Sequence, residues 1–320
     1  MDQNKLYREN NSVINTRLGK YIKTIANYLP GGLPRFLVLL LPSAGLYIGV
    51  FVFNYYPLGM SNHWFAPMLV FFYVLLRALC SQYLLSNKMF TANAEIVFGG
   101  LNIINLGVIT TMLINLFAIN ELNYLIFSSL GLVCASLTYY KQFKTSILII
   151  PRIGQTELLL ILACIVFLSN LKPANDYYNL PIGSFILFDV VILLISCGFL
   201  LYALRLLVVT KNVTYGVWLF IGSIVITTIF AALSLSLIQA IIVITIYCAS
   251  YAIKLKTATL LDGLERSAGL FTPLVLVTAY FMESLYPRNT FIILMAYLGF
   301  SLLMFCYRTF ARQQTASEEE

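Results

Sequence analysis

Long apolar segments follow one another along this chain and are separated by short polar breaks. A helix needs about 20 predominantly apolar residues to cross the hydrocarbon of a bilayer. The pattern therefore predicts ten membrane-spanning helices, at residues 35–54, 65–86, 95–119, 123–140, 157–171, 181–204, 214–233, 235–253, 268–285 and 289–307. Asn120-Glu121-Leu122-Asn123 separates the third span from the fourth, and Ser234 with its neighbours separates the seventh from the eighth.

The basic residues test this span number independently, because loops rich in Lys and Arg stay in the cytoplasm. Ten spans place both termini and every second loop on one side of the membrane. That side receives Lys5, Arg8, Arg17, Lys20, Lys23, Arg35, Lys88, Lys141, Lys144, Arg152, Arg205, Lys211, Lys254, Lys256, Arg266, Arg308 and Arg312. The other side receives Lys172 and Arg288. This bias predicts a multi-pass protein with both termini in the cytosol.

The composition excludes an ordinary soluble fold. Hydrophobic residues make up 60% of the chain, charged residues make up 10%, and the mean hydropathy is +0.87. A soluble domain carries roughly a quarter charged residues. We therefore expect an all-α integral membrane protein with one membrane domain at residues 34–307. A cytosolic lead-in at residues 1–33 precedes this domain, and a cytosolic tail at residues 308–320 follows it.

The lead-in has apolar positions at helical spacing among basic ones, and it lacks the apolar core of a signal peptide. The apolar positions are Leu18, Tyr21, Ile22, Ile25, Tyr28 and Leu29. This spacing favours an amphipathic helix that lies in the membrane interface before Pro30-Gly31-Gly32 turns the chain inward. An ordinary cytosolic lead-in explains the same pattern equally well.

The net charge of +7 is spread over loop ends, which fits membrane topology better than a nucleic-acid-binding face. We therefore expect membrane lipids as partners and no nucleic acid. The chain has one histidine, His63, and no Cys-x-x-Cys pair, so neither a zinc site nor a cofactor is predicted. The cysteines lie inside apolar stretches and are interpreted as buried small hydrophobes. They are Cys80, Cys134, Cys164, Cys197, Cys248 and Cys306.

Ionisable side chains in apolar spans are the default functional candidates, because charge is costly to bury in a bilayer. The candidates are Arg77, Glu95, Glu157, Asp189, Asp262 and Glu265. The island Asp262-Gly263-Leu264-Glu265-Arg266 has no second carboxylate pair at helical spacing, so no metal is expected there. Gly99-Gly100 favours close helix packing over phosphate binding. Nucleotide-binding motifs and nucleophile–base pairs are absent from the sequence, and no catalytic, cofactor-binding or metal residue is predicted.

Several stretches nevertheless occur in the order of a known family of membrane enzymes. They are Tyr28-Leu29-Pro30 with Pro34-Arg35-Phe36-Leu37-Val38, residues 142–148 with 154–158, residues 251–255 with 269–274, and Met304-Phe305-Cys306-Tyr307-Arg308. In these stretches and in its order of spans, the chain resembles the cholinephosphotransferase and ethanolaminephosphotransferase family, the eukaryotic branch of the CDP-alcohol phosphotransferases. The resemblance implies the ten-helix bundle of that family, whose members transfer a phosphoalcohol from a CDP-alcohol to diacylglycerol.

The family motif Asp-x2-Asp-Gly-x2-Ala-Arg-x8-Gly-x3-Asp-x3-Asp implies four aspartates that hold divalent cations against a pyrophosphate. When the motif is anchored on residues 94–105, the aspartate positions are Arg77, Cys80, Phe98 and Asn102. The remaining signature positions are Ser81, Leu84-Leu85, Ala94 and, in place of a histidine, Gly99. Residues 3–175 contain no aspartate in any register. The metal site that the family needs is therefore missing from this sequence.

Three hypotheses about function follow. The leading one is a catalytically inactive relative that binds lipid or serves as a regulatory subunit, as a homodimer or in a heterodimer with an active family member. The alternatives are an active phosphotransferase with a divergent site and an unrelated transporter of lipids or small molecules. Arg77 either contacts a phosphate directly or extends to the interface as a structural cation. In a eukaryotic cell, the resemblance implies the endoplasmic reticulum or the Golgi.

Overall fold

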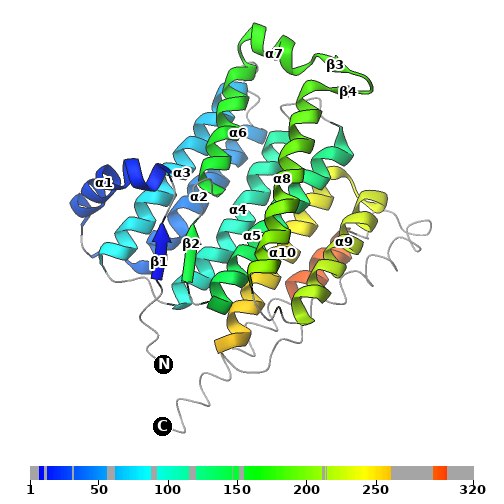
Figure 1. Cartoon of the computed structure of the whole chain (residues 1–320). Coiled ribbons are helices and arrows are strands. Elements are labelled where there is room, and N and C mark those ends of the chain that lie inside the picture. Colours follow the sequence, from blue (N-terminus) through cyan, green and yellow to red (C-terminus); the bar gives the residue numbers. More distant parts are fainter. Residues whose placement is uncertain are drawn as a thin grey trace.

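Helices that run side by side dominate the computed structural model of the protein (Figure 1). The structure describes residues 7–10, 13–30, 32–55, 62–87, 92–114, 120–145, 147–150, 155–210, 213, 215–260 and 291–300. Its helices are α1 (Val13–Tyr28), α2 (Arg35–Tyr55), α3 (Asn62–Ser86), α4 (Ala92–Ile114), α5 (Glu121–Thr145), α6 (Gln155–Ser169), α7 (Lys172–Tyr178), α8 (Leu187–Val209), α9 (Tyr215–Ser234) and α10 (Leu237–Leu260). The short strands are β1 (Tyr7–Asn10), β2 (Ile147–Ile150), β3 (Pro181–Ile182) and β4 (Phe185–Ile186). One more helix covers Phe291–Phe300.

Several helices have the length and apolar character that a membrane span requires. Within the described part of the chain, five meet both criteria, over Arg35–Val52, Trp64–Leu84, Glu121–Gln142, Leu187–Val209 and Gly216–Ser234. Four shorter apolar helices lie where the sequence predicts four further spans, at Phe98–Met112, Leu159–Ser169, Leu237–Ile253 and Phe291–Phe300. The ninth expected span, at residues 268–285, lies outside the described residues. The chain is thus mostly helical, with several helices that are able to cross a bilayer.

Hydropathy predicts a span over residues 181–204, but the corresponding helix, α8, begins at Leu187. Residues 181–186 instead form the antiparallel strands β3 and β4. Gly183, in the turn between them, has a φ of 64°, a left-handed conformation that glycine adopts without strain. Pro181 has no backbone N–H to donate within a helix. Turn chemistry therefore sets the start of α8, and this short hairpin is a local addition to a mostly helical chain.

A second short strand pair joins β1 and β2. The two strands are parallel, with Tyr7 opposite Ile147 and Asn10 opposite Ile150. This pairing holds the N-terminal segment beside the segment that follows α5. The β3–β4 hairpin and α7 cap one end of the bundle, whereas β1 and β2 lie in the opposite half (Figure 1).

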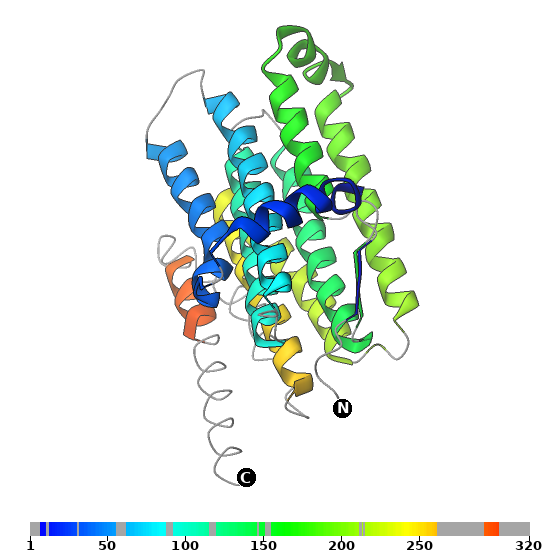
Figure 2. The same cartoon turned by 90° about the vertical axis from the view of Figure 1, so that its left-hand side faces the viewer.

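The helix predicted in the lead-in is present as α1, and it runs across the upright helices on the side of α3 (Figure 2). Ala26 of α1 belongs to a buried cluster with Tyr83 and Leu84 of α3. The Tyr83 hydroxyl donates to the Pro30 carbonyl at 2.8 Å and accepts from the Leu33 N–H at 3.3 Å. These contacts fix the turn between α1 and α2 against the last turns of α3.

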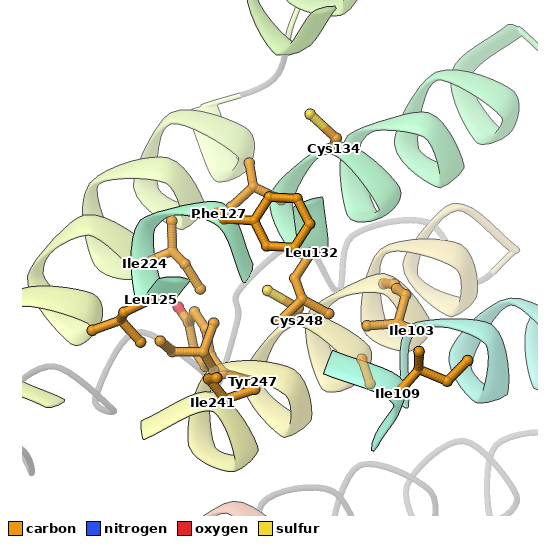
Figure 3. Packing of buried hydrophobic residues seen from close by; sticks show 14 of the residues in the cluster. Ile103, Ile109, Leu125, Phe127, Leu132, Cys134, Ile224, Ile241, Tyr247 and Cys248 are labelled. Carbon is orange, nitrogen blue, oxygen red and sulfur yellow. The ribbon is translucent and has the colours of Figure 1, made fainter. Parts of the chain in front are cut away.

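The centre of the bundle is the contact of α10 with α4 and α5. Figure 3 shows apolar side chains of α4, α5, α9 and α10 converging there, among them Ile103, Leu132 and Cys248. Two glycines let α4 approach α10 closely. A Cβ on Gly100 would come within 2.8 Å of the Cδ1 of Ile253, and a Cβ on Gly107 would overlap Thr245. Small residues allow such close approach in membrane helices, which is the packing role that the sequence predicts for Gly100.

We predict that Gly107→Ala destabilises the bundle, because the added methyl group would overlap Thr245 and overpacking costs roughly 1–3 kcal/mol. Gly222→Ala is the matched control, since nothing lies within 4 Å of a Cβ at that helical position. The measurement is the melting temperature of the full-length protein in detergent. The control should melt at or above the wild-type temperature, because alanine favours helix over glycine. Equal melting temperatures for the two variants would contradict the proposed close contact.

Candidate functional site

The structure brings together positions on α3 and α4 that the motif alignment singles out. The guanidinium carbon of Arg77 lies 5.6 Å from the ring centroid of Phe98, a cation–π contact. Cys80 and Phe98 share one buried cluster with Leu84. Arg77, Cys80 and Leu84 recur at intervals of three and four residues, so they line one face of α3. That face meets Phe98 of α4.

Arg77 carries a buried donor that no described residue satisfies. Its Nη1 is inaccessible to solvent and has no hydrogen-bond partner in the part of the chain that the structure describes. Leaving a buried polar group unpaired costs roughly 1–3 kcal/mol, and more when the group is charged. The ring of Phe98 offsets only part of this cost, because a cation–π contact contributes about 0.5–2 kcal/mol. The α3–α4 contact therefore holds a cation with an unused N–H.

Asn102 and Gly99 of α4 both contact the side chain of Tyr139 on α5. The Asn102 Nδ2 donates to the Tyr139 hydroxyl at 2.9 Å. A Cβ on Gly99 would come within 3.0 Å of the Tyr139 ring, so glycine makes room for the ring at this position. The position at which the family resemblance implies a histidine is thus a packing contact with an aromatic side chain.

Gln142 is a second unsatisfied polar group, and sequence reasoning did not single it out as a candidate. It lies one turn beyond Tyr139 on α5 and is only 3% exposed. Neither its Nε2 nor its Oε1 has a hydrogen-bond partner among the described residues. Tyr124 donates to the Thr110 carbonyl of α4 at 2.6 Å, so the face of α5 that bears Tyr124 and Tyr139 points toward α4. Gln142 continues this face by helical spacing, which is the signal that could have found it.

Asn105 forms a further polar layer, one turn along α4 from Asn102. Its Nδ2 donates to the Ser43 hydroxyl of α2 and to the Tyr73 hydroxyl of α3, both at 3.0 Å. Its Oδ1 is buried and has no partner within the described ranges. Tyr73 precedes Arg77 by one helical turn, so this layer lies next to the Arg77–Phe98 contact. We call Arg77, Phe98, Asn102, Asn105, Tyr139 and Gln142, together with Ser43 and Tyr73, the α3–α4–α5 polar site.

The polar site contains amide, hydroxyl and guanidinium groups and no carboxylate. In the part of the chain that the structure describes, no group of three or more His, Cys, Asp or Glu side chains could hold a metal ion. Unpaired donors on an arginine and an amide suit an oxygen-rich or anionic ligand, because an arginine N–H binds phosphate and carboxylate oxygens strongly. The side chains of this site are therefore equipped for hydrogen bonding rather than for metal binding among the described residues.

The carboxylates that the sequence singled out do not gather at the polar site. Asp189 is buried in the first turn of α8, where its Oδ1 accepts the Asn120 N–H at 3.0 Å and its Oδ2 accepts the Ile186 N–H at 3.4 Å. Glu157 is buried in the first turn of α6, where the positive end of the helix dipole favours an acid. Asp262 and Glu265 lie outside the described residues, as does the side chain of Glu95.

Asp189 has a structural role, because its two hydrogen bonds join the start of α8 to the residue that precedes α5. We predict that Asp189→Ala lowers the stability of the protein by about 1–3 kcal/mol, the cost of leaving buried N–H groups unpaired. Asp189→Asn keeps one acceptor and should cost less. Melting temperatures in detergent, with amide exchange at Asn120, measure both effects. A wild-type melting temperature for Asp189→Ala would show that the cap is dispensable.

Comparison with known proteins assigns no family to this chain. No family model matches it, and no curated protein matches it.

Proposed function

We propose that the chain is a non-catalytic relative of the CDP-alcohol phosphotransferases that binds a phospholipid at the α3–α4–α5 polar site. The observation that carries this proposal is the buried, unpaired Nη1 of Arg77. Arg77 stands at the first aspartate position of the motif alignment, where the family holds a divalent cation against a phosphate. A fixed guanidinium at this position would supply positive charge to a phosphate without any metal.

The same position argues against catalysis. A scheme with two metal ions needs carboxylates to hold the ions against the pyrophosphate. The four aligned positions instead present Arg77, Cys80, Phe98 and Asn102, and a guanidinium would repel divalent cations. Gly99 packs on Tyr139 where a base would be expected. Binding without turnover is the function that these contacts support best.

We predict that Arg77→Ala weakens the binding of phospholipid by about tenfold or more, since a hydrogen bond to a charged group contributes about 1.5–3 kcal/mol. Arg77→Lys keeps the charge but loses the planar donor geometry, so its loss should be smaller. The measurement is native mass spectrometry of the full-length protein titrated with phosphatidylcholine, with diacylglycerol as the phosphate-free comparison. Arg205→Ala is the matched control, because Arg205 is an exposed arginine on α8.

Two outcomes would contradict this proposal. The first is equal binding of phosphatidylcholine by the wild type and by Arg77→Ala, which would leave Arg77 as an ordinary interfacial cation. The second is turnover of radiolabelled CDP-choline or CDP-ethanolamine with diacylglycerol and magnesium or manganese, which would indicate an active enzyme with a divergent site. The native spectra also report subunit composition. A second copy or an active relative in them would support the role of a regulatory partner that the resemblance implies.

We further infer ten spans with both termini in the cytosol, in the endoplasmic reticulum or Golgi of a eukaryotic cell. The pairing of β1 with β2 supports this topology, because the N-terminal strand lies beside the segment that follows α5, as two segments of one side would. The basic residues Lys141 and Lys144 near the end of α5 belong to that side. At the opposite end, the segment formed by α7 and the β3–β4 hairpin has Lys172 as its single basic residue.

This topology predicts opposite accessibility for two epitope tags. A tag inserted between Gly183 and Ser184, in the β3–β4 turn, should resist protease in sealed vesicles whose cytosolic face points outward. A tag after Glu320 should be removed by the same treatment. Detergent should expose both tags, which controls for intrinsic resistance to the protease. Cleavage of both tags before detergent is added would put the hairpin on the cytosolic side and would contradict the proposed topology.

A further inference from the structure

Helix α1 presents two distinct apolar ridges. Ile22 and Ala26 are buried, and Ala26 packs in a cluster with Tyr83 and Leu84 of α3. Tyr21, Ile25 and Tyr28 recur at intervals of four and three residues on a neighbouring face, and they are 67, 54 and 85% exposed. Large apolar side chains that line up and remain uncovered mark an interaction surface. The outer ridge of α1 therefore needs an occupant that the described part of the chain does not provide.

The charge of α1 indicates what that occupant is. The helix contains Arg17, Lys20 and Lys23 and no acidic residue. Lys20 and Lys23 are exposed, and helical spacing places them on the polar side of α1, with Lys23 nearly opposite the outer ridge. An apolar face with cations on the remaining surface is the pattern of a helix that lies in the surface of a membrane. The cations complement acidic lipid headgroups.

The position of α1 fits the edge of a bilayer. The apolar window of α3 ends at Leu84, and that of α2 begins at Arg35. Helix α1 packs against Tyr83 and Leu84, and the Tyr83 hydroxyl holds the chain that leads into α2 at Leu33. Figure 2 shows α1 crossing the direction of the upright helices. The C-terminal part of α1 thus lies at the level at which α3 ends and α2 begins, where lipid headgroups are expected.

We propose that α1 docks on acidic phospholipid headgroups of the adjoining leaflet. Tyr21, Ile25 and Tyr28 insert at the boundary between headgroups and acyl chains, where tyrosine rings are favoured. Lys20 and Lys23 contact the acidic headgroups. The docking does not involve the α3–α4–α5 polar site, so the experiment below tests it separately from the proposed function.

The test uses the full-length protein in nanodiscs of phosphatidylcholine alone or of phosphatidylcholine with phosphatidylserine. Hydrogen exchange of the amides in residues 13–28 is compared between the two. Exchange should be slower in the acidic nanodiscs, by about fivefold for each lysine in contact with the surface. The double variant Lys20→Gln/Lys23→Gln should lose this difference. Tyr21→Ser/Ile25→Ser should exchange faster in both lipids, because it removes the apolar anchor.

A matched variant separates the lysines of α1 from the net charge of the protein. Lys144→Gln/Arg205→Gln removes the same charge from exposed residues of α5 and α8, and it should keep the lipid dependence of α1. Equal exchange of wild-type α1 in the two nanodiscs would overturn the proposal. So would a lipid dependence that survives in Lys20→Gln/Lys23→Gln. Size-exclusion profiles identical to that of the wild type show that each variant has folded.

Discussion

The close approach of α4 to α10 is the contact on which the rest of the bundle depends. Gly100 and Gly107 lie on one face of α4 and leave room for Ile253 and Thr245 of α10. In a bilayer, where lipid is as apolar as the side chains, packing of this kind holds helices together. Because the glycines commit one face of α4 to α10, helical geometry turns the opposite face, which carries Asn105, toward α2 and α3.

That opposite face explains how polar side chains come to be buried in an apolar bundle. Asn102 and Asn105 find partners on three neighbouring helices, so most of their donors are satisfied inside the protein. Among the described residues, Arg77 and Gln142 keep unpaired atoms on helices adjacent to α4, and so do Asn123, Ser128, Thr227 and Ser234 elsewhere on α5 and α9. A buried polar atom without a partner is costly in an apolar environment. A ligand bound at the polar site would remove that cost for Arg77 and Gln142.

Polar capping and surface contacts place the ends of the helices. Asp189 joins the start of α8 to Asn120, and the strand pair of β1 with β2 ties the N-terminal segment to the end of α5. Tyr83 anchors α1 to α3 through the backbone of the turn that follows α1. These interactions leave the outer ridge of α1 uncovered while its inner ridge is buried. At the ends of the bundle, these contacts therefore hold the helices in place while the outer ridge of α1 stays exposed.

The sequence by itself determined the long apolar helices of the described residues and most of their boundaries, because apolar runs of span length have few alternatives in a bilayer and leave a strong hydropathy signal. It also showed that no aspartate precedes residue 176 except Asp2. Only the tertiary structure placed Arg77 over Phe98 and left Gln142 unpaired, because such contacts depend on which helix faces which. Hydropathy also did not predict the β3–β4 hairpin, since a turn at Gly183 depends on backbone conformation rather than on apolar character.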